Sequence, residues 1–240
     1  MKRPKITLVG AGPGDPELLS LAGVRALETA DVVLYDALVN PAILAYAKKN
    51  TKKIFVGKRA GCHSYVQDNI NKMLVDFANS YGHVVRLKGG DPYIFGRGSE
   101  ELQFAKSKNI ETSVIPGVSS AIAVAELAGI SLINKNGSSD FWVITGSTKD
   151  GGLSRDLYLA AKLDQTVVIL MGIQHIEKIV ELYKMEGRGS LPIAIVQNGS
   201  LDNQRMFFST IETVLHEIAD KQVLTPAILV IGKSAAIERC

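Results

Sequence analysis

The chain has 240 residues, of which 46% are hydrophobic and 21% charged, and it carries a formal net charge of +3. This balance excludes an intrinsically disordered chain and provides enough apolar surface for two domains. The net charge is too small to indicate a nucleic-acid partner by itself, and no apolar run approaches the roughly 18–20 residues of a membrane-spanning helix.

The N-terminal segment contains only one short apolar run, Ile6–Val9, before its first glycines. This run is shorter than the core of a secretory signal peptide. We therefore expect a cytoplasmic protein with neither a nucleic-acid nor a membrane partner.

In the first half, short apolar runs alternate with amphipathic segments, which is typical of βα units around a parallel sheet. The spacing of apolar residues predicts helices over Glu17–Thr29 and Tyr65–Phe77, and the other intervening segments are also expected to be helical. The predicted strands are Ile6–Val9, Val32–Tyr35, Ile54–Val56, Val84–Leu87 and Ser113–Ile115.

Pro116-Gly117 interrupts the chain near its middle and predicts a boundary between domains at 1–116 and 117–240. Helices are expected over Val118–Ala128 and at about 154–163, 174–185 and 211–219. The predicted strands of this half are Phe141–Thr145, Thr166–Met171, Ile193–Gln197, Met206–Ser209 and Ile228–Ile231. A short turn between the third and fourth of these strands indicates a hairpin in a mixed sheet. The fold class is therefore α/β, with two α/β domains.

The turn Gly10–Asp15 directly follows the first predicted strand. A dinucleotide-binding fingerprint would need Gly or Ala where Asp15 stands, and Pro13 has no amide hydrogen for a phosphate. The carboxylate would also repel a pyrophosphate. The turn therefore argues against a nicotinamide-dependent oxidoreductase and leaves either a structural turn or a different ligand.

A second glycine turn, Gly89-Gly90-Asp91, follows the fourth predicted strand. Paired glycines allow a ligand to approach the backbone, and Asp91 can accept hydrogen bonds from ribose hydroxyls or an amine. Two acid-bearing turns suit a positively charged, hydroxylated ligand such as S-adenosylmethionine better than a phosphate. After Pro116-Gly117, the hydroxyls of Ser119 and Ser120 either cap a helix or contact the ligand.

The two cysteines, Cys62 and Cys240, are far apart, and the four histidines are scattered along the chain. This spacing predicts neither a disulfide framework nor a metal site.

Several segments together resemble the uroporphyrinogen-III C-methyltransferases of the tetrapyrrole methylase family. They are, in order, GAGPGDPELLSL, VVLYDALV, FVGKRAG, VVRLKGGDPYIFGRGSEE and VIPGVSSA. The resemblance implies a homodimer whose subunits bind S-adenosylmethionine in the cleft between two α/β domains, with the tetrapyrrole on the side of the N-terminal one. It also implies methylation of uroporphyrinogen III at C2 and C7 to precorrin-2, with S-adenosylhomocysteine as the second product, for sirohaem or cobalamin biosynthesis.

The same resemblance implies roles for individual residues. Asp36 would be a general base and Lys58 a proton donor, where the sequence alone suggests a helix cap and a solvated charge. Arg97 and Glu100 would belong to a catalytic turn, although Glu100 also suits the first turn of a helix. The implied donor contacts are Pro13, Gly89, Gly90, Asp91, Ile94, Ser119, Ser120, Met171, Gly199 and Ala227.

The tetrapyrrole carries a carboxylate on every side arm, so its site needs cations. The resemblance implies Arg59, Arg97 and Lys135, and Arg86 and Lys88 are further candidates. A guanidinium can hold a carboxylate through two parallel hydrogen bonds.

Three positions differ from the family pattern. Ala37 and Lys135 stand where arginines are usual, next to Asn134, and Ser147 stands where a histidine is usual. All three belong to the acceptor side, and Lys135 keeps the charge without the planar fork of arginine. Two alternatives therefore stay open: a related tetrapyrrole methylase with a different acceptor, and a catalytically weak module that binds S-adenosylmethionine.

Overall fold

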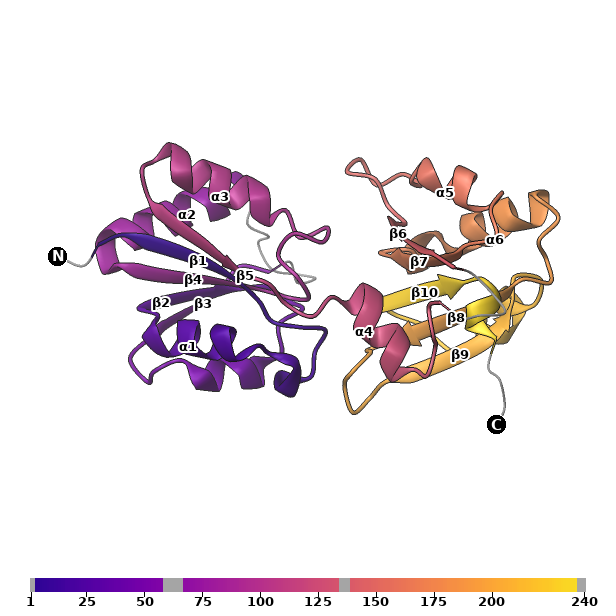
Figure 1. Cartoon of the computed structure of the whole chain (residues 1–240), viewed down its shortest axis with the longest axis horizontal. Coiled ribbons are helices and arrows are strands. Elements are labelled where there is room, and N and C mark those ends of the chain that lie inside the picture. Colours follow the sequence, from indigo (N-terminus) through magenta and orange to yellow (C-terminus); the bar gives the residue numbers. More distant parts are fainter. Residues whose placement is uncertain (1–2, 58–66, 134–138, 237–240) are drawn as a thin grey trace. The chain divides into compact units, whose positions relative to one another are not determined.

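The computed structural model describes residues 3–57, 67–133 and 139–236 (Figure 1). The chain divides into two compact units, Met1–Ser119 and Ser120–Cys240. The boundary between them lies three residues after the position at which Pro116 suggested it.

The first unit contains a parallel sheet with the strand order β3-β2-β4-β1-β5. Every strand predicted in this half is present, with bounds shifted by at most two residues. The strands are β1 (Lys5–Gly10), β2 (Val32–Tyr35), β3 (Lys52–Phe55), β4 (His83–Lys88) and β5 (Glu111–Ile115).

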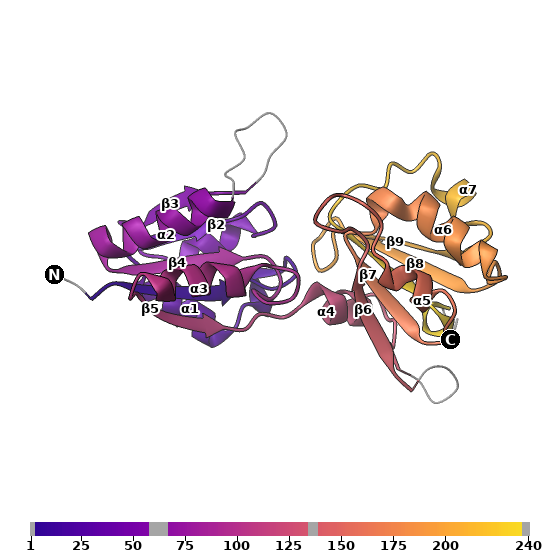
Figure 2. The ribbon, with the colours of Figure 1, turned by 90° about the horizontal axis from the view of Figure 1, so that it is seen from above.

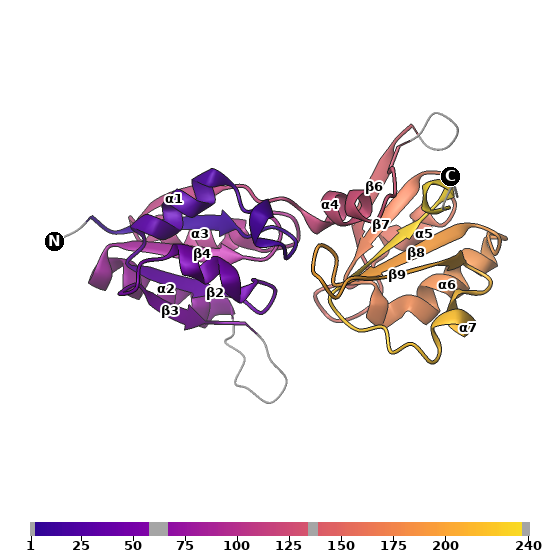
Figure 3. The same ribbon diagram turned by 90° about the horizontal axis from the view of Figure 1, so that it is seen from below.

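Helices cover both faces of this sheet, and its central strands β1, β2 and β4 are buried over most of their length. The helices α2 (Gln67–Tyr81) and α3 (Gly98–Ser107) pack on the face that carries Ile6 and Leu8 (Figure 2). The helix α1 (Leu21–Thr29) packs on the opposite face, against Val9 (Figure 3).

The predicted helix over Glu17–Thr29 is wrong in its first part, because two side-chain caps divide it. Asp15 Oδ1 accepts a hydrogen bond from the amide of Glu17 at 2.9 Å and starts a 3₁₀ turn, Pro16–Leu18. After an extended Leu19, the Ser20 hydroxyl accepts from the amide of Gly23 at 3.1 Å and starts α1. Between β2 and β3 a 3₁₀ helix, Pro41–Tyr46, replaces the expected α-helix.

The second unit contains a mixed sheet with the order β6-β7-β10-β8-β9. β6 pairs with β7 in parallel and the other pairs are antiparallel, so the predicted mixed sheet and its β8–β9 hairpin are confirmed. The strands are β6 (Phe141–Thr145), β7 (Thr166–Leu170), β8 (Pro192–Gln197), β9 (Arg205–Thr210) and β10 (Ala227–Ile231).

The helices of the second unit divide between the two faces of its sheet. The residues of α5 (Asp156–Ala160), α6 (Ile176–Met185) and α7 (Val214–Ile218) pack into one core with Ile169 and Ile195. α4 (Ser120–Leu127) packs on the other face, against Val168 and Val230. In the part of the chain described here, no helix has the length and apolar character needed to cross a membrane.

Candidate active site

Two loops at the carboxyl edge of the first sheet are joined by backbone hydrogen bonds. The loop after β1 and the loop after β4 form a short antiparallel bridge between Gly12 and Gly90. The amide of Gly90 donates to the carbonyl of Gly12 at 2.7 Å, and the amide of Ala11 donates to the carbonyl of Lys88 at 2.7 Å. β1 and β4 are neighbours in a parallel sheet, so both loops emerge at the same edge.

The loop after β5 packs against these two loops without any side chain between the backbones. A Cβ atom on Gly117 would lie 2.2 Å from the carbonyl oxygen of Gly90 and 2.6 Å from Cα of Gly10. A Cβ atom on Gly10 would lie 2.4 Å from Cα of Gly117. Glycine is therefore required at both positions, and Pro116-Gly117 is part of the site as well as a break near the unit boundary.

Gly89 and Gly90 serve different purposes. A Cβ atom on Gly89 would lie 2.5 Å from Cβ of Leu38, so Gly89 packs directly on the turn that carries Asp36. Gly90 has φ +65°, which favours glycine, yet a Cβ atom there would meet nothing within 4 Å. The loop thus presents an open backbone face at Gly90.

The Asp91 carboxylate holds the loops together. Its Oδ2 accepts from the amide of Gly117 at 3.0 Å and its Oδ1 accepts from the amide of Tyr93 at 2.8 Å. A carboxylate has about four acceptor positions, so capacity for a ligand remains. The sequence suggested a ligand contact for Asp91 and gave no indication of its second role as a link between two loops.

The turn after Asp91 has an unusual backbone and exposed side chains. Phe95 and Arg97 both have positive φ, at 54° and 58°, which is rare for residues other than glycine and typical of functional loops. Ile94 and Phe95 are exposed. Arg97 precedes the first residue of α3 and forms a two-pronged ion pair with Glu100, with Nη2 2.6 Å from Oε2 and Nε 3.1 Å from Oε1. The hydrogen bonds that Arg97 donates to the Glu100 carboxylate raise the pKa of Arg97, which stays charged.

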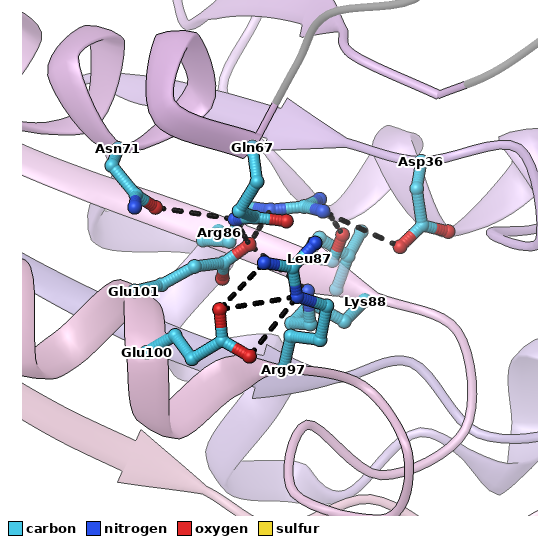
Figure 4. A network of polar contacts seen from close by, with 9 residues as sticks. All are labelled: Asp36, Gln67, Asn71, Arg86, Leu87, Lys88, Arg97, Glu100 and Glu101. Atoms are coloured by element: carbon cyan, nitrogen blue, oxygen red, sulfur yellow. Dashed lines mark hydrogen bonds and ion pairs between the residues drawn. The ribbon is translucent and has the colours of Figure 1, made fainter. Parts of the chain in front are cut away.

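Behind this edge lies a buried polar network on the face that packs against α3 (Figure 4). Glu101 Oε1 lies 3.0 Å from Gln67 Nε2, 3.1 Å from Lys88 Nζ and 3.4 Å from Arg86 Nε. Arg86 Nη2 reaches Asp36 Oδ2 at 3.6 Å. Arg86, Lys88 and Glu101 are only 3%, 5% and 1% exposed.

The suggestion that Arg86 and Lys88 provide surface cations for a polyacidic substrate is therefore wrong. Both side chains point into the domain and are paired with Glu101, a residue that was not among the predicted site residues. A usable indication was present, because residues two apart on a strand share one face and two cations on a buried face need an anion. Glu101, on the amphipathic segment that follows, supplies it.

Asp36 follows β2 and is held on both oxygens. Oδ1 accepts from the amide of Leu38 at 3.1 Å, and Oδ2 faces Arg86. The carboxylate remains partly exposed, so it is fixed in place and still accessible. Lys58, Arg59, Asn134 and Lys135 lie outside the described residues.

In the second unit, the predicted donor residues gather at one edge of the sheet. β10 runs antiparallel to β7 and β8, so it begins where those two strands end. Its first residue, Ala227, pairs with Gln197 at the carboxyl end of β8. Ala227 therefore lies at the same edge of the sheet as Met171, which directly follows β7. Met171 is half exposed with φ 56°, which differs from an ordinary core methionine. A Cβ atom on Gly199 would lie 2.3 Å from Val124 of α4, the helix that Ser120 begins.

The structure also shows where the remaining residues singled out in the sequence lie. Pro13 lies in the loop after β1, in the first unit together with Ser119. Ser147 closes a tight turn in which its carbonyl accepts from the Thr145 hydroxyl at 2.9 Å. Ala37 is exposed beside Asp36. No group of three or more metal-binding side chains was found among the described residues.

The sequence is similar to a known protein family and to several characterised proteins. The model of the family described as Tetrapyrrole (Corrin/Porphyrin) Methylases matches residues 5–215. The chain is 43% identical over 231 residues to the uroporphyrinogen-III C-methyltransferase of Methanocaldococcus jannaschii, covering 95% of this chain and 96% of that protein. It is 44% identical to the siroheme synthase of Zymomonas mobilis, covering 99% of this chain and 50% of the relative, so it spans about half of that longer protein.

The fold is similar to that of solved structures. A uroporphyrin-III C-methyltransferase from Thermus thermophilus, complexed with S-adenosylhomocysteine, has a TM-score of 0.82 and 35% identity, covering 96% of this chain and 98% of that one. A cobalt precorrin-4 methyltransferase has a TM-score of 0.86 at 22% identity, covering 97% and 96%, which shows a shared fold alone.

We expect Gly117→Ala to lower the free energy of unfolding by about 1–3 kcal/mol, because the added methyl forces the backbones of two loops apart. Urea unfolding measures this. Gly152→Ala is the matched control, since its Cβ would meet only the Thr148 hydroxyl, at 3.3 Å. Equal stability of the two variants would contradict the close backbone packing.

Lys88 makes stability depend on pH. Burial lowers the pKa of Lys88 and the charge of Arg86 lowers it further, whereas Glu101 and Asp36 raise it. Between this lowered pKa and the ordinary value of 10.5, the unfolded chain holds the Lys88 proton and the folded chain does not, so stability rises with pH. The free energy of unfolding of the wild type relative to Lys88→Met should therefore increase from neutral pH toward 10.5. A difference that is independent of pH would contradict the buried position of the ammonium group.

Proposed function

Because the chain belongs to the tetrapyrrole methylase family, we propose that it is a uroporphyrinogen-III C-methyltransferase. It would transfer methyl groups from S-adenosylmethionine to C2 and C7 of uroporphyrinogen III and release precorrin-2 and S-adenosylhomocysteine. The observation that carries the proposal is the open backbone face at Gly90, built by three interlocked glycine loops in a chain 43% identical to a uroporphyrinogen-III C-methyltransferase.

The residues at the carboxyl edge of the first sheet fit the donor. The open face at Gly90 admits a ligand to the backbone, and Asp91 keeps acceptor capacity for hydroxyl or ammonium groups. In this proposal Pro13, Gly89 and Ile94 complete the contacts from the first loops. When bound, S-adenosylmethionine supplies an electrophilic methyl group on a sulfonium. Ser119, Ser120, Met171, Gly199 and Ala227 are proposed as the other donor contacts.

The acceptor chemistry requires alignment and removal of a proton. Asp36 is suited to accept that proton, because its carboxylate is partly exposed and fixed by Arg86 and the amide of Leu38. Lys58 is proposed as the proton donor. Arg97 and Glu100 lie on the exposed turn before α3, where the guanidinium can meet a side-arm carboxylate by exchanging or sharing its partner Glu100.

With Arg86 and Lys88 buried, the substrate carboxylates depend on other cations. We propose Arg97, Arg59 and Lys135 for this role. The product would serve sirohaem or cobalamin biosynthesis, and the protein would act as a homodimer in the cytoplasm with the tetrapyrrole as its partner. The additional activities of the longer siroheme synthases are not included in this proposal.

The direct test is to incubate the purified protein with S-adenosylmethionine and enzymatically made uroporphyrinogen III without oxygen. We expect precorrin-2, detected by mass spectrometry or as its fluorescent oxidised form. Retention of the donor without any product would indicate a binding module. Turnover of a later precursor instead of uroporphyrinogen III would assign a different acceptor.

Two substitutions separate the donor and acceptor sides. Asp91→Ala should raise the dissociation constant of S-adenosylhomocysteine at least ten-fold in calorimetry, because two loops lose their link. Arg97→Ala should raise KM for the tetrapyrrole by about ten-fold or more, corresponding to the roughly 1.5–3 kcal/mol of a hydrogen bond to a charged group. It should change the dissociation constant of S-adenosylhomocysteine less than two-fold.

Lys184→Ala is the matched control for Arg97→Ala, since Lys184 forms a comparable exposed ion pair, with Glu212 at 3.0 Å in the second unit. This control should leave both constants unchanged. If Arg97→Ala weakened donor binding alone, the proposed division of the site would be wrong.

A further inference from the structure

We propose that Glu101 is a positioning residue for the methyl transfer: its buried carboxylate holds Arg86 and Lys88 in place and thereby fixes Asp36 relative to the Gly89–Asp91 loop. This inference rests on the proposed methyltransferase function and concerns a residue that touches neither donor nor acceptor in that proposal.

The contacts of Glu101 are concentrated on one oxygen. Oε1 accepts hydrogen bonds from three side-chain nitrogens: Gln67 Nε2 at 3.0 Å, Lys88 Nζ at 3.1 Å and Arg86 Nε at 3.4 Å (Figure 4). Oε2 is buried and has no hydrogen-bond partner among the described residues. The carboxylate therefore acts as a single anionic point that holds two cations from β4.

Each of these two cations lies next to a different part of the candidate site. Arg86 reaches Asp36 Oδ2 at 3.6 Å, so it orients the proposed base. Lys88 is the last residue of β4, directly before Gly89, and its carbonyl accepts from the amide of Ala11 at 2.7 Å. Glu101 itself lies in the first turn of α3, next to the residue that pairs with Arg97. One carboxylate thus connects the base, the donor loops and the substrate turn within the first unit.

The place of the network in the sheet argues against a purely structural role. On this face the core is apolar along most of its length, with Ile6, Leu8, Val84, Leu102 and Ala105. Along β4, this face changes from the apolar Val84 to the charged Arg86 and Lys88 as the strand approaches the edge that carries the glycine loops. Buried ion pairs give little stability compared with apolar side chains of the same volume, so stability alone does not explain them here.

Charge balance shows how Glu101 would act on Asp36. Among the described residues of the network, two cations, Arg86 and Lys88, face two carboxylates, Glu101 and Asp36. Without the charge of Glu101, both cations would have Asp36 as their remaining anionic partner. Arg86 and Lys88 would be drawn toward it, and the carboxylate would lose its fixed position and its readiness to accept a proton.

Glu101→Gln tests this with little change of shape. The amide oxygen can occupy the position of Oε1, where the three donors lie, and the amide nitrogen the position of Oε2, which has no described partner. We expect kcat to fall at least ten-fold. The dissociation constant of S-adenosylhomocysteine and KM for the tetrapyrrole should each change less than three-fold, and circular dichroism should show a folded protein.

Glu111→Gln is the matched control. Glu111 also pairs with two cations, Lys5 and Arg3, at 3.7 and 3.5 Å, in the same unit but at the opposite edge of the sheet. The kcat of the Glu111→Gln variant should equal that of the wild type. An unchanged kcat in Glu101→Gln, or a loss of donor affinity in parallel with kcat, would overturn the positioning role.

A double variant covers the case in which Glu101→Gln fails to fold. Lys88→Met with Glu101→Gln leaves Arg86 and Asp36 as a balanced pair and should recover stability, yet kcat should stay at least ten-fold low because the Glu101 carboxylate no longer holds Arg86 Nε in place. Recovery of kcat together with stability would show that Glu101 is only structural. An inactive wild type would refute the proposed function and this inference with it, whereas an active wild type with a fully active Glu101→Gln would refute this inference alone.

Discussion

The site depends on the direct contact of three loop backbones at the carboxyl edge of the parallel sheet. Gly10, Gly90 and Gly117 approach so closely that a single Cβ atom on the first or last would collide with another loop. This contact is possible because β1 lies between β4 and β5 in the sheet, so their following loops emerge side by side. Asp91 then links the second loop to the third through the amide of Gly117.

Cations on this edge divide into two kinds with different physical roles. Arg86 and Lys88 point inward, where burial requires an anion, and Glu101 and Asp36 supply the charges. Arg97 points outward from a strained turn, and its partner Glu100 is also exposed, so the pair can reorganise around a ligand. The inward charges fix the position of the Asp36 carboxylate, whereas the outward guanidinium of Arg97 remains accessible from the surface.

Much of the fold could be predicted from the sequence because the central strands of the first sheet are buried on both faces, so that β1, β2 and β4 each contain a short apolar run. The mixed second sheet followed from the short turn between β8 and β9. Helix boundaries were less predictable, since the caps formed by Asp15 and Ser20 depend on which local hydrogen bond prevails. The helical periodicity of Glu17–Thr29 continued through Leu19 although the backbone there is extended.

The glycine loops of the candidate site could also be predicted, because glycine is needed where backbones approach too closely for a Cβ atom. The direction of Arg86 and Lys88 could not be obtained from charge alone, since it depends on α3 packing over β4. The link from Asp91 to Gly117 joins residues 26 apart and likewise required the tertiary structure. Sequence patterns identified the loops, and packing decided which of their charges face inward.

The most direct measurement is a crystal structure of the protein with S-adenosylhomocysteine. The ligand should lie against the backbone of Gly90, with the Asp91 carboxylate still accepting a hydrogen bond from the amide of Gly117. A ligand bound elsewhere, with the Gly89–Asp91 loop empty, would contradict this prediction.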